Sequence, residues 1–150
     1  MIVDDRDRVL LCSFEIASLG VPLWATPGGG LEEGETVLVA LARELAEEIG
    51  LVLVEDPPHI WREVIDDPRI AVGFDGLIND VYFVRVEAFE PRGSMSEAEL
   101  AEEGVTGFQW WTQQELSMHA GPDLFGPRNL PDLVRVLMVD GVPAVPLEVG

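Results

Sequence analysis

The chain has 150 residues, enough for one domain with a hydrophobic core and few for two. Lys and Arg total 9 against 28 Asp and Glu, and the formal charge of −19 argues against a nucleic-acid partner, because a polyanion would be repelled. No apolar stretch approaches the ~20 residues of a membrane span, and the residues at 1–8 do not have the apolar core expected of a signal peptide. The single Cys12 excludes an internal disulfide. We therefore expect one cytoplasmic domain over residues 1–150, away from membranes.

The first half of the chain predicts three strands and a helix. The strands are short apolar runs rich in β-compatible residues, at 8–14, 22–26 and 59–65. Residues 36–49 give the strongest helical pattern, because leucine and isoleucine recur at helical spacing and Gly50 follows as a stop.

The second half predicts two more strands among three helices. A run of valine and aromatic residues at 77–89 predicts a single strand, since it is too long for a turn, and it follows a polar loop at 66–76. Another strand is expected at 106–111. Two Ser/Thr-x-x-Glu capping boxes and an apolar stripe predict helices that begin at Ser96, Thr112 and Asn129. Strands and helices interleave, which favours an α/β or α+β sandwich.

The predicted helix at 36–49 carries three glutamates that can act together. Glu44, Glu47 and Glu48 are related as i, i+3 and i+4, so they share one face. The alternative is an ordinary solvated acidic face. Against it, the same face continues toward the helix start through apolar residues, which predicts a packed side with the acids at the edge of a cleft.

Like charges at this spacing repel each other by a few tenths of a kcal/mol per exposed pair, about the size of a favourable pair. A divalent cation would reverse the sign of that interaction. Hard oxygen ligands suit Mg²⁺, which proteins bind through a few carboxylates together with substrate phosphates.

Neighbouring residues could complete such a site. Arg43 lies four residues before Glu47, close enough to orient it, although alone it predicts only a weak surface ion pair. Gly28, Gly29 and Gly30 precede the helix and would let a backbone carbonyl or amide approach a metal or phosphate. Three glycines after a proline would otherwise indicate a simple turn.

These residues together resemble the complete Nudix box, with every fixed position filled between Gly29 and Leu51. The match is specific, because chance rarely fills so many typed positions at fixed spacing. The matching residues are Gly29, Glu35, Arg43, Glu44, Leu45, Glu47, Glu48, Gly50 and Leu51. The resemblance implies an α/β/α sandwich with a mixed sheet, and hydrolysis of a nucleoside diphosphate linked to another moiety with Mg²⁺ or Mn²⁺.

The resemblance also implies roles for individual residues. Arg43 and Glu35 would form a supporting salt bridge, and the glycines at 28–30 would contact substrate. The metal ligands would be Glu44, Glu47, Glu48 and a carbonyl of Gly28 or Gly29.

The general base is left open by the sequence. It is either a box glutamate, Glu47 or Glu44, or a glutamate from a loop before a late strand. Glu103 and its neighbour Glu102 are the candidates for the loop role, and a solvated helix end explains them about equally well.

Two functions are consistent with the sequence. The favoured one is a metal-dependent pyrophosphohydrolase acting on a nucleotide, dinucleotide, ADP-ribose or nucleotide-sugar. The alternative is a Nudix-fold module that senses a nucleotide without hydrolysing it, and the intact box favours catalysis. The sequence also leaves room for a homodimer.

The leaving group must be read from the loops at 14–22, 66–76 and 119–128. Phe125 in the last of these loops is expected to belong to a lid, because Gly and Pro surround it. His59 and His119 are expected to have structural or surface roles, since neither has an acid–base partner nearby in sequence.

Overall fold

The structure of the protein is a computed structural model that describes residues 1–70, 73 and 75–150. The helices within these residues are α1 (Val37–Ile49), α2 (Glu97–Glu102), α3 (Gln113–Met118) and α4 (Leu130–Asp140). Its nine strands in the described residues are β1 (Ile2–Val3), β2 (Val9–Glu15), β3 (Pro22–Ala25), β4 (His59–Ile65), β5 (Leu77–Tyr82), β6 (Val84–Arg85), β7 (Val105–Trp111), β8 (Leu124–Phe125) and β9 (Leu147–Val149). None of the helices in these described ranges is both long and apolar enough to cross a bilayer.

The strands form two sheets, which we call sheet A and sheet B. Sheet A has the order β6-β1-β2-β3-β8, and β7 also pairs with β2. Its pairs β1–β6 and β3–β8 are parallel and the others antiparallel, so the sheet is mixed as predicted. Sheet B has the order β5-β4-β9.

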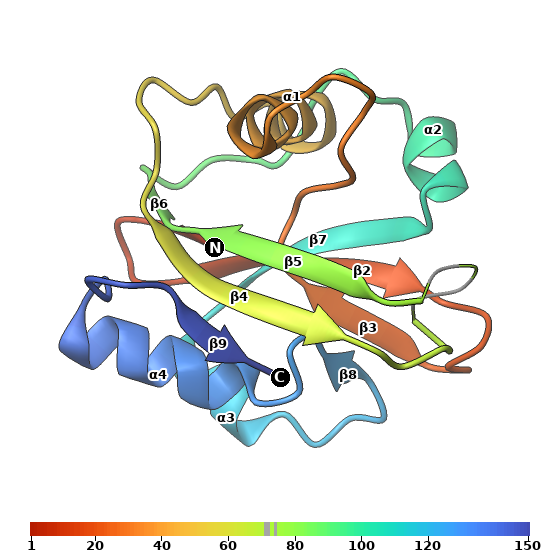
Figure 1. The fold of residues 1–150 in the computed structure, drawn as a ribbon. Coiled ribbons are helices and arrows are strands. Elements are labelled where there is room, and N and C mark those ends of the chain that lie inside the picture. Colours follow the sequence, from red (N-terminus) through yellow and green to blue (C-terminus); the bar gives the residue numbers. More distant parts are fainter. Residues whose placement is uncertain (71–72, 74) are drawn as a thin grey trace.

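The residues of β2 alternate between two apolar cores on opposite faces of sheet A. Leu10 packs in one core with Leu45 and Ile49 of α1. Its neighbours Val9 and Leu11 belong to the larger core, which includes residues of sheet B and of α4. Figure 1 shows α1 above sheet A and α3 and α4 below it, with β4 and β5 in front. The predicted α/β/α sandwich with a mixed sheet is confirmed.

The single strand predicted at 77–89 is wrong. The strand β5 ends at Tyr82, and after Phe83 the chain continues as β6 in the other sheet. The Phe83 N–H donates to the Pro58 carbonyl at 2.9 Å, beside β4, and the Val84 N–H donates to the Met1 carbonyl at 2.9 Å, in sheet A. A continuous apolar run predicts strand residues, but it does not show that their partner strands change from sheet B to sheet A within the run.

Three short strands were missed. The first, β1, lies between β2 and β6 in sheet A. The tail strand β9 runs parallel to β4, and β8 lies where a lid was expected. Phe125 pairs in β8 with β3, and its ring packs edge-on against Trp111 at 5.7 Å. The lid assignment of Phe125 is therefore corrected to a strand of sheet A.

The predicted helix boundaries hold more closely. The Thr36 side chain caps α1, and both capping boxes are formed, at Ser96 and at Thr112. Asn129 is the N-cap residue of α4 as predicted, but its side chain makes no capping hydrogen bond.

Candidate active site

Two glutamates of α1, Glu44 and Glu48, lie next to residues 28–30, which we call the glycine loop. The helix buries Leu45 and Ile49 against sheet A, and the neighbouring face carries Glu44 and Glu48. These two acids are only 6% and 1% exposed. The packed acidic face predicted from the sequence is therefore present only in part, because Val37 at the start of the same face is 37% exposed.

Three carboxylates converge at this point from two helices. Oxygens of Glu44, Glu48 and Glu103 all lie within 4.8 Å of one another, and we call these three residues the carboxylate cluster. Glu103 is the exposed C-cap residue of α2. Its neighbour Glu102 is not part of this group, so the geometry separates the two loop candidates.

Glu47 lies outside the carboxylate cluster. Its side chain is 41% exposed, and its Oε2 accepts a hydrogen bond from Arg43 Nη1 at 3.2 Å. Its assignment as metal ligand or base stays a prediction.

Arg43 connects the helix to the preceding loop. Its Nε and Nη2 donate to the two oxygens of Glu35 at 2.8 and 2.9 Å, a bidentate pair. The hydrogen bond from Arg43 lowers the pKa of Glu35 to about 2. Arg43 also donates to Glu44 at 2.8 Å and to the Gly30 carbonyl at 3.0 Å. One guanidinium therefore fixes the loop, the helix and one member of the carboxylate cluster.

The glycine loop lies so close to the carboxylate of Glu44 that a side chain on Gly29 would not fit. A Cβ on Gly29 would lie 2.4 Å from both Cδ and Oε1 of Glu44. The Gly28 N–H donates to Glu48 Oε2 at 3.0 Å. At Gly28 the structure thus shows an amide in contact with a box glutamate, and the expected carbonyl ligand stays a prediction.

The carboxylate cluster favours the binding of protons or of a cation, because its members are close together and two of them are buried. Burial raises the pKa of Glu48 to about 7, and burial also raises the pKa of Glu44 despite its ion pair with Arg43. Nearby Glu103 raises both further. Three carboxylates at this distance are a donor set that suits a hard divalent ion such as Mg²⁺ or Mn²⁺, so the residues present fit the predicted metal.

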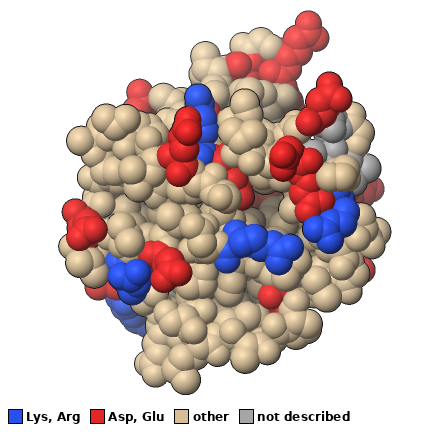
Figure 2. Space-filling view, turned by 60° about the horizontal axis from the view of Figure 1, so that its bottom comes forward, with Lys and Arg blue, Asp and Glu red and all other residues tan. Residues whose placement is uncertain are grey.

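Other basic side chains are engaged with acids at the surface. Figure 2 shows one face of the molecule, on which basic side chains lie close to acidic ones. The ion pairs include Arg62–Asp80, Arg69–Asp67, Arg85–Asp7 and Arg135–Asp132.

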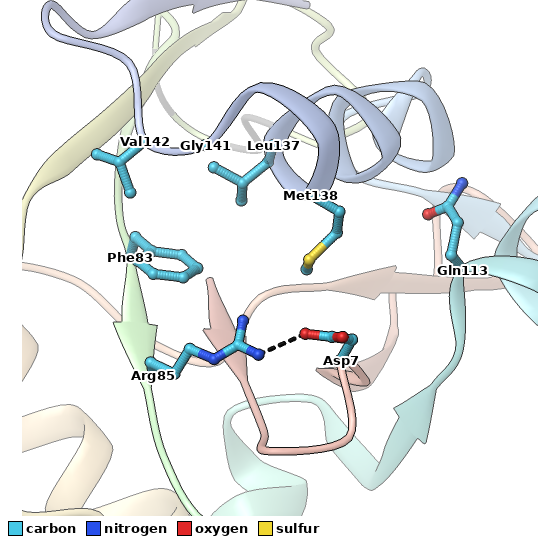
Figure 3. A pocket seen from close by; sticks show the side chains of 8 residues that line it. All are labelled: Asp7, Phe83, Arg85, Gln113, Leu137, Met138, Gly141 and Val142. Carbon is cyan, nitrogen blue, oxygen red and sulfur yellow. Dashed lines mark hydrogen bonds and ion pairs between the residues drawn. The ribbon is translucent and has the colours of Figure 1, made fainter.

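A separate hollow of about 380 Å³ lies on the α4 side of sheet A. Figure 3 shows its largely apolar wall and the ion pair between Arg85 and Asp7 at one side. It is lined by Asp7, Phe83, Arg85, Gln113, Leu137, Met138, Gly141 and Val142. None of the carboxylate cluster lines it, so this hollow is separate from the candidate site.

The sequence analysis missed Glu63 of β4. This glutamate is 8% exposed, and Asn79 Nδ2 donates to its Oε2 at 3.2 Å. Burial raises the pKa of its carboxyl group. Strand alternation could have found it, because the inward-facing Trp61 lies two residues earlier on the same face.

Both histidines contact aromatic rings, and His59 also has an acidic neighbour that the sequence did not predict, with its Nε2 3.1 Å from Asp80 Oδ1. His59 stacks on Tyr82 with ring centroids 4.8 Å apart, and His119 packs edge-on against Trp111 at 5.4 Å. In the candidate specificity loops, the Ser18 hydroxyl donates to the Arg69 carbonyl. Within the loop at 66–76, residues 71, 72 and 74 lie outside the described residues.

The mixed sheet and the glutamate-bearing helix behind a glycine loop define a Nudix-type domain. The family model for the NUDIX domain matches residues 1–131, and the chain belongs to this family. The resemblance inferred from the box is thereby confirmed. The single domain over 1–150 stays a prediction.

The similar curated proteins include nucleoside triphosphatases called NudI. The chain is 35% identical to the NudI of Enterobacter sp. (strain 638) over 86 residues, which cover 55% of this chain and 59% of that protein. It is 41% identical to the NudI of Salmonella paratyphi B over 63 residues, 41% of this chain and 43% of that protein. The chain therefore spans about half the length of the curated relatives it matches.

Solved structures with the same fold include two MutT proteins. The MutT protein from Methanosarcina mazei Go1 has a TM-score of 0.62 at 17% identity, with 93% of this chain and 89% of that chain covered. The MutT NUDIX hydrolase from Burkholderia pseudomallei has a TM-score of 0.60 at 23% identity, with 87% and 92% covered. At these identities the likeness shows the fold alone.

Proposed function

We propose that this protein is a Nudix pyrophosphohydrolase that hydrolyses a diphosphate linkage of a nucleotide with Mg²⁺ or Mn²⁺, and that nucleoside triphosphates are its first candidate substrates. The observation that carries the proposal is the convergence of Glu44, Glu48 and Glu103 within 4.8 Å. Relatives named nucleoside triphosphatase support the substrate class.

The carboxylates of Glu44, Glu48 and Glu103 would hold the cation, with Glu47 as a further ligand. When bound, a divalent cation neutralises phosphate charge and makes a water more acidic. Such neutralisation is needed here, because a protein with a formal charge of −19 otherwise repels a polyphosphate.

For the base we favour Glu103. It is the exposed member of the carboxylate cluster and comes from a different element, so a water between it and the substrate can reach it. Glu44 is bonded to Arg43 at 2.8 Å, and Glu47 is bonded to the same guanidinium at 3.2 Å. Arg43 would act by holding these carboxylates, and Glu44 or Glu47 remains the alternative base.

The backbone of Gly28, Gly29 and Gly30 is proposed to contact the substrate phosphates. Two observations support this role. Two of these glycines already contact box residues, at Glu48 and Arg43, and Gly29 faces Glu44 without an intervening side chain. A phosphate bound through the cation would therefore lie beside their peptide groups.

The test is a phosphate-release screen over nucleoside triphosphates, ADP-ribose, dinucleotides and nucleotide-sugars, with Mg²⁺ and with Mn²⁺. The wild type is compared with Glu48→Gln and with Glu33→Gln, which neutralises an exposed acid of the same stretch. We expect hydrolysis of at least one substrate, lost in Glu48→Gln and kept in Glu33→Gln. Tight binding of a nucleotide without turnover would instead establish the sensing module. A cytoplasmic location and a homodimer stay predictions of the sequence.

A further inference from the structure

The helix that carries Glu103 into the carboxylate cluster is not positioned by a buried side chain of its own. All six residues of α2 lie in the described part of the chain, and none of them is buried. Leu100 is half-buried and the helix contacts β7, and hydrogen bonds anchor the chain on both sides of α2. After α2, the Gly104 carbonyl accepts the Glu15 N–H at 2.9 Å, and the buried Val105 begins β7.

Before α2, the chain closes on the end of α1. The N–H groups of Arg92, Gly93 and Met95 donate to the carbonyls of Ile49, Glu48 and Glu47, at 3.1, 3.1 and 3.0 Å. The last carbonyls of a helix have no partner within the helix, so these bonds satisfy them. We call residues 92–95 the clasp. In Figure 1 the segment between β6 and α2 runs past α1 before it enters α2.

Two glycines make this approach possible. A Cβ on Gly93 would lie 2.0 Å from the Glu47 carbonyl oxygen and 2.7 Å from that of Ala46. A Cβ on Gly50 would lie 2.3 Å from the Arg92 carbonyl oxygen. Gly50 also has a φ of 74°, which suits glycine at a helix end, whereas Gly93 has no positive φ. Gly93 is thus needed for space alone.

The clasp joins the two helices whose glutamates must meet. Two of its three hydrogen bonds end on the peptide groups of Glu47 and Glu48. Met95, the last clasp residue, directly precedes Ser96, the N-cap of α2. The capping box fixes the start of α2, so the clasp sets one end of this short helix, and Gly104 anchors the other end beside Glu103.

We propose that Gly93 is a positioning residue for catalysis: by letting the clasp close on α1, it places Glu103 against Glu44 and Glu48. The inference rests on the proposed function, since it gives Glu103 a role in the reaction. It assigns a functional requirement to a residue outside the box.

The first experiment measures kcat, KM and Mn²⁺ affinity, the last with the metal alone, for Gly93→Ala. Misplacing a reacting group by about 1 Å can lower the rate about 100-fold, so we expect kcat to fall by about 10- to 100-fold. Mn²⁺ affinity should fall as well. Gly107→Ala is the matched control, because a Cβ there meets nothing within 4 Å among the described residues. Wild-type kcat in Gly93→Ala would overturn the proposal.

A double-mutant cycle separates positioning from general damage. If the clasp acts through Glu103, Gly93→Ala should lower kcat much less in a Glu103→Gln background than in the wild type. Equal losses in both backgrounds would overturn the proposal while leaving the proposed function intact. Full activity of Glu103→Gln would also overturn it. The proposed function itself fails only if the wild type hydrolyses nothing or Glu48→Gln stays active.

A second variant covers the case in which Gly93→Ala does not fold. Met95→Pro removes the N–H that donates to Glu47 and leaves Gly93 in place. We expect a smaller loss of kcat with the same dependence on Glu103. Hydrogen exchange should then accelerate at Arg92 and Gly93 but not in β4. Unchanged kcat together with accelerated exchange would show a structural role only, against the proposal.

Discussion

Glu48 in α1 and Glu63 in β4 are both buried glutamates, and they differ in what surrounds them. Burial raises the pKa of both. Glu48 lies with two further carboxylates and accepts the Gly28 N–H. Glu63 accepts from Asn79 and has no Lys or Arg within ion-pair distance in the described part of the chain. Burial is therefore common to both glutamates, and the convergence of several carboxylates distinguishes Glu48.

The two environments also arise differently. Glu63 faces Asn79 because the β4–β5 register places them opposite each other. Glu48 meets its neighbours through a glycine loop, a helix and a second helix that are separate in sequence. The contact between Glu63 and Asn79 requires only that two strands pair, whereas the carboxylate cluster requires the loop and both helices to be in place.

The largest difference is expected in activity. Glu48→Gln should lower kcat/KM on the order of 10²- to 10³-fold, comparable to the loss of one preorganised charge-stabilising group. The same change at Glu63 should leave kcat/KM near the wild-type value. Steady-state kinetics with the best substrate of the screen provide the measurement. A comparable loss in Glu63→Gln would place both glutamates in the site and end the distinction.

Added metal should raise the thermal stability of the protein in a way that depends on Glu48 but not on Glu63. Saturating a site at about 100 times its Kd adds about 2.7 kcal/mol, which for a chain of this size corresponds to roughly 5–10 °C in Tm. We expect this rise with Mg²⁺ or Mn²⁺ in the wild type and in Glu63→Gln, reversed by EDTA. Glu48→Gln should show little rise. An equal rise in all three proteins would mean that the cation binds elsewhere.

The close approach of the glycine loop is the next feature to test. In Gly29→Ala the new Cβ would lie 2.4 Å from the Glu44 carboxylate, which must then turn away. We expect kcat/KM to fall about tenfold, equivalent to about 1.4 kcal/mol. Steady-state kinetics of the wild type, Gly29→Ala and the control Gly107→Ala measure this. Wild-type activity in Gly29→Ala would show that Glu44 need not stay where the structure places it.

The smallest effect concerns stability against pH at Glu63. Because the folded protein raises this carboxyl's pKa above 4.5, ionisation is less favourable in the folded than in the unfolded state. Below that pH both states are protonated. As pH rises through the folded-state pKa, the wild type should lose up to about 1 kcal/mol relative to Glu63→Gln. Urea unfolding at pH 4 and pH 8 measures this, and a difference between the two proteins that does not change with pH would contradict it.

The sequence predicted the helix side of the site well. The helix predicted at 36–49 is observed at Val37–Ile49, with Gly50 ending it in the left-handed conformation. These features are local, because helical spacing and a stop glycine depend on residues close in sequence. The ion pair of Arg43 with Glu35 was inferred from the family resemblance and is present at 2.8 Å. The choice between Glu102 and Glu103 needed the position of α2 relative to α1.

The parts that the sequence did not predict depend on distant partners. The strands β8 and β9 are two and three residues long and exist because β3 and β4 offer them an edge. The change of sheet at Phe83 has the same cause. Gly93 lies in a non-periodic stretch with Pro91, so only the coordinates show that it touches the end of α1.

The pairing of β2 also has a consequence for protein synthesis. This strand is buried over its first five residues, and its Val9 pairs with Trp111, far along the chain. While the ribosome is still translating the middle of the chain, the edge of β2 that pairs with β7 in the folded protein has no partner. Long-range strand pairing folds slowly, and exposed apolar edges favour aggregation. The centre of sheet A is therefore the part of the fold that is most exposed to aggregation during translation.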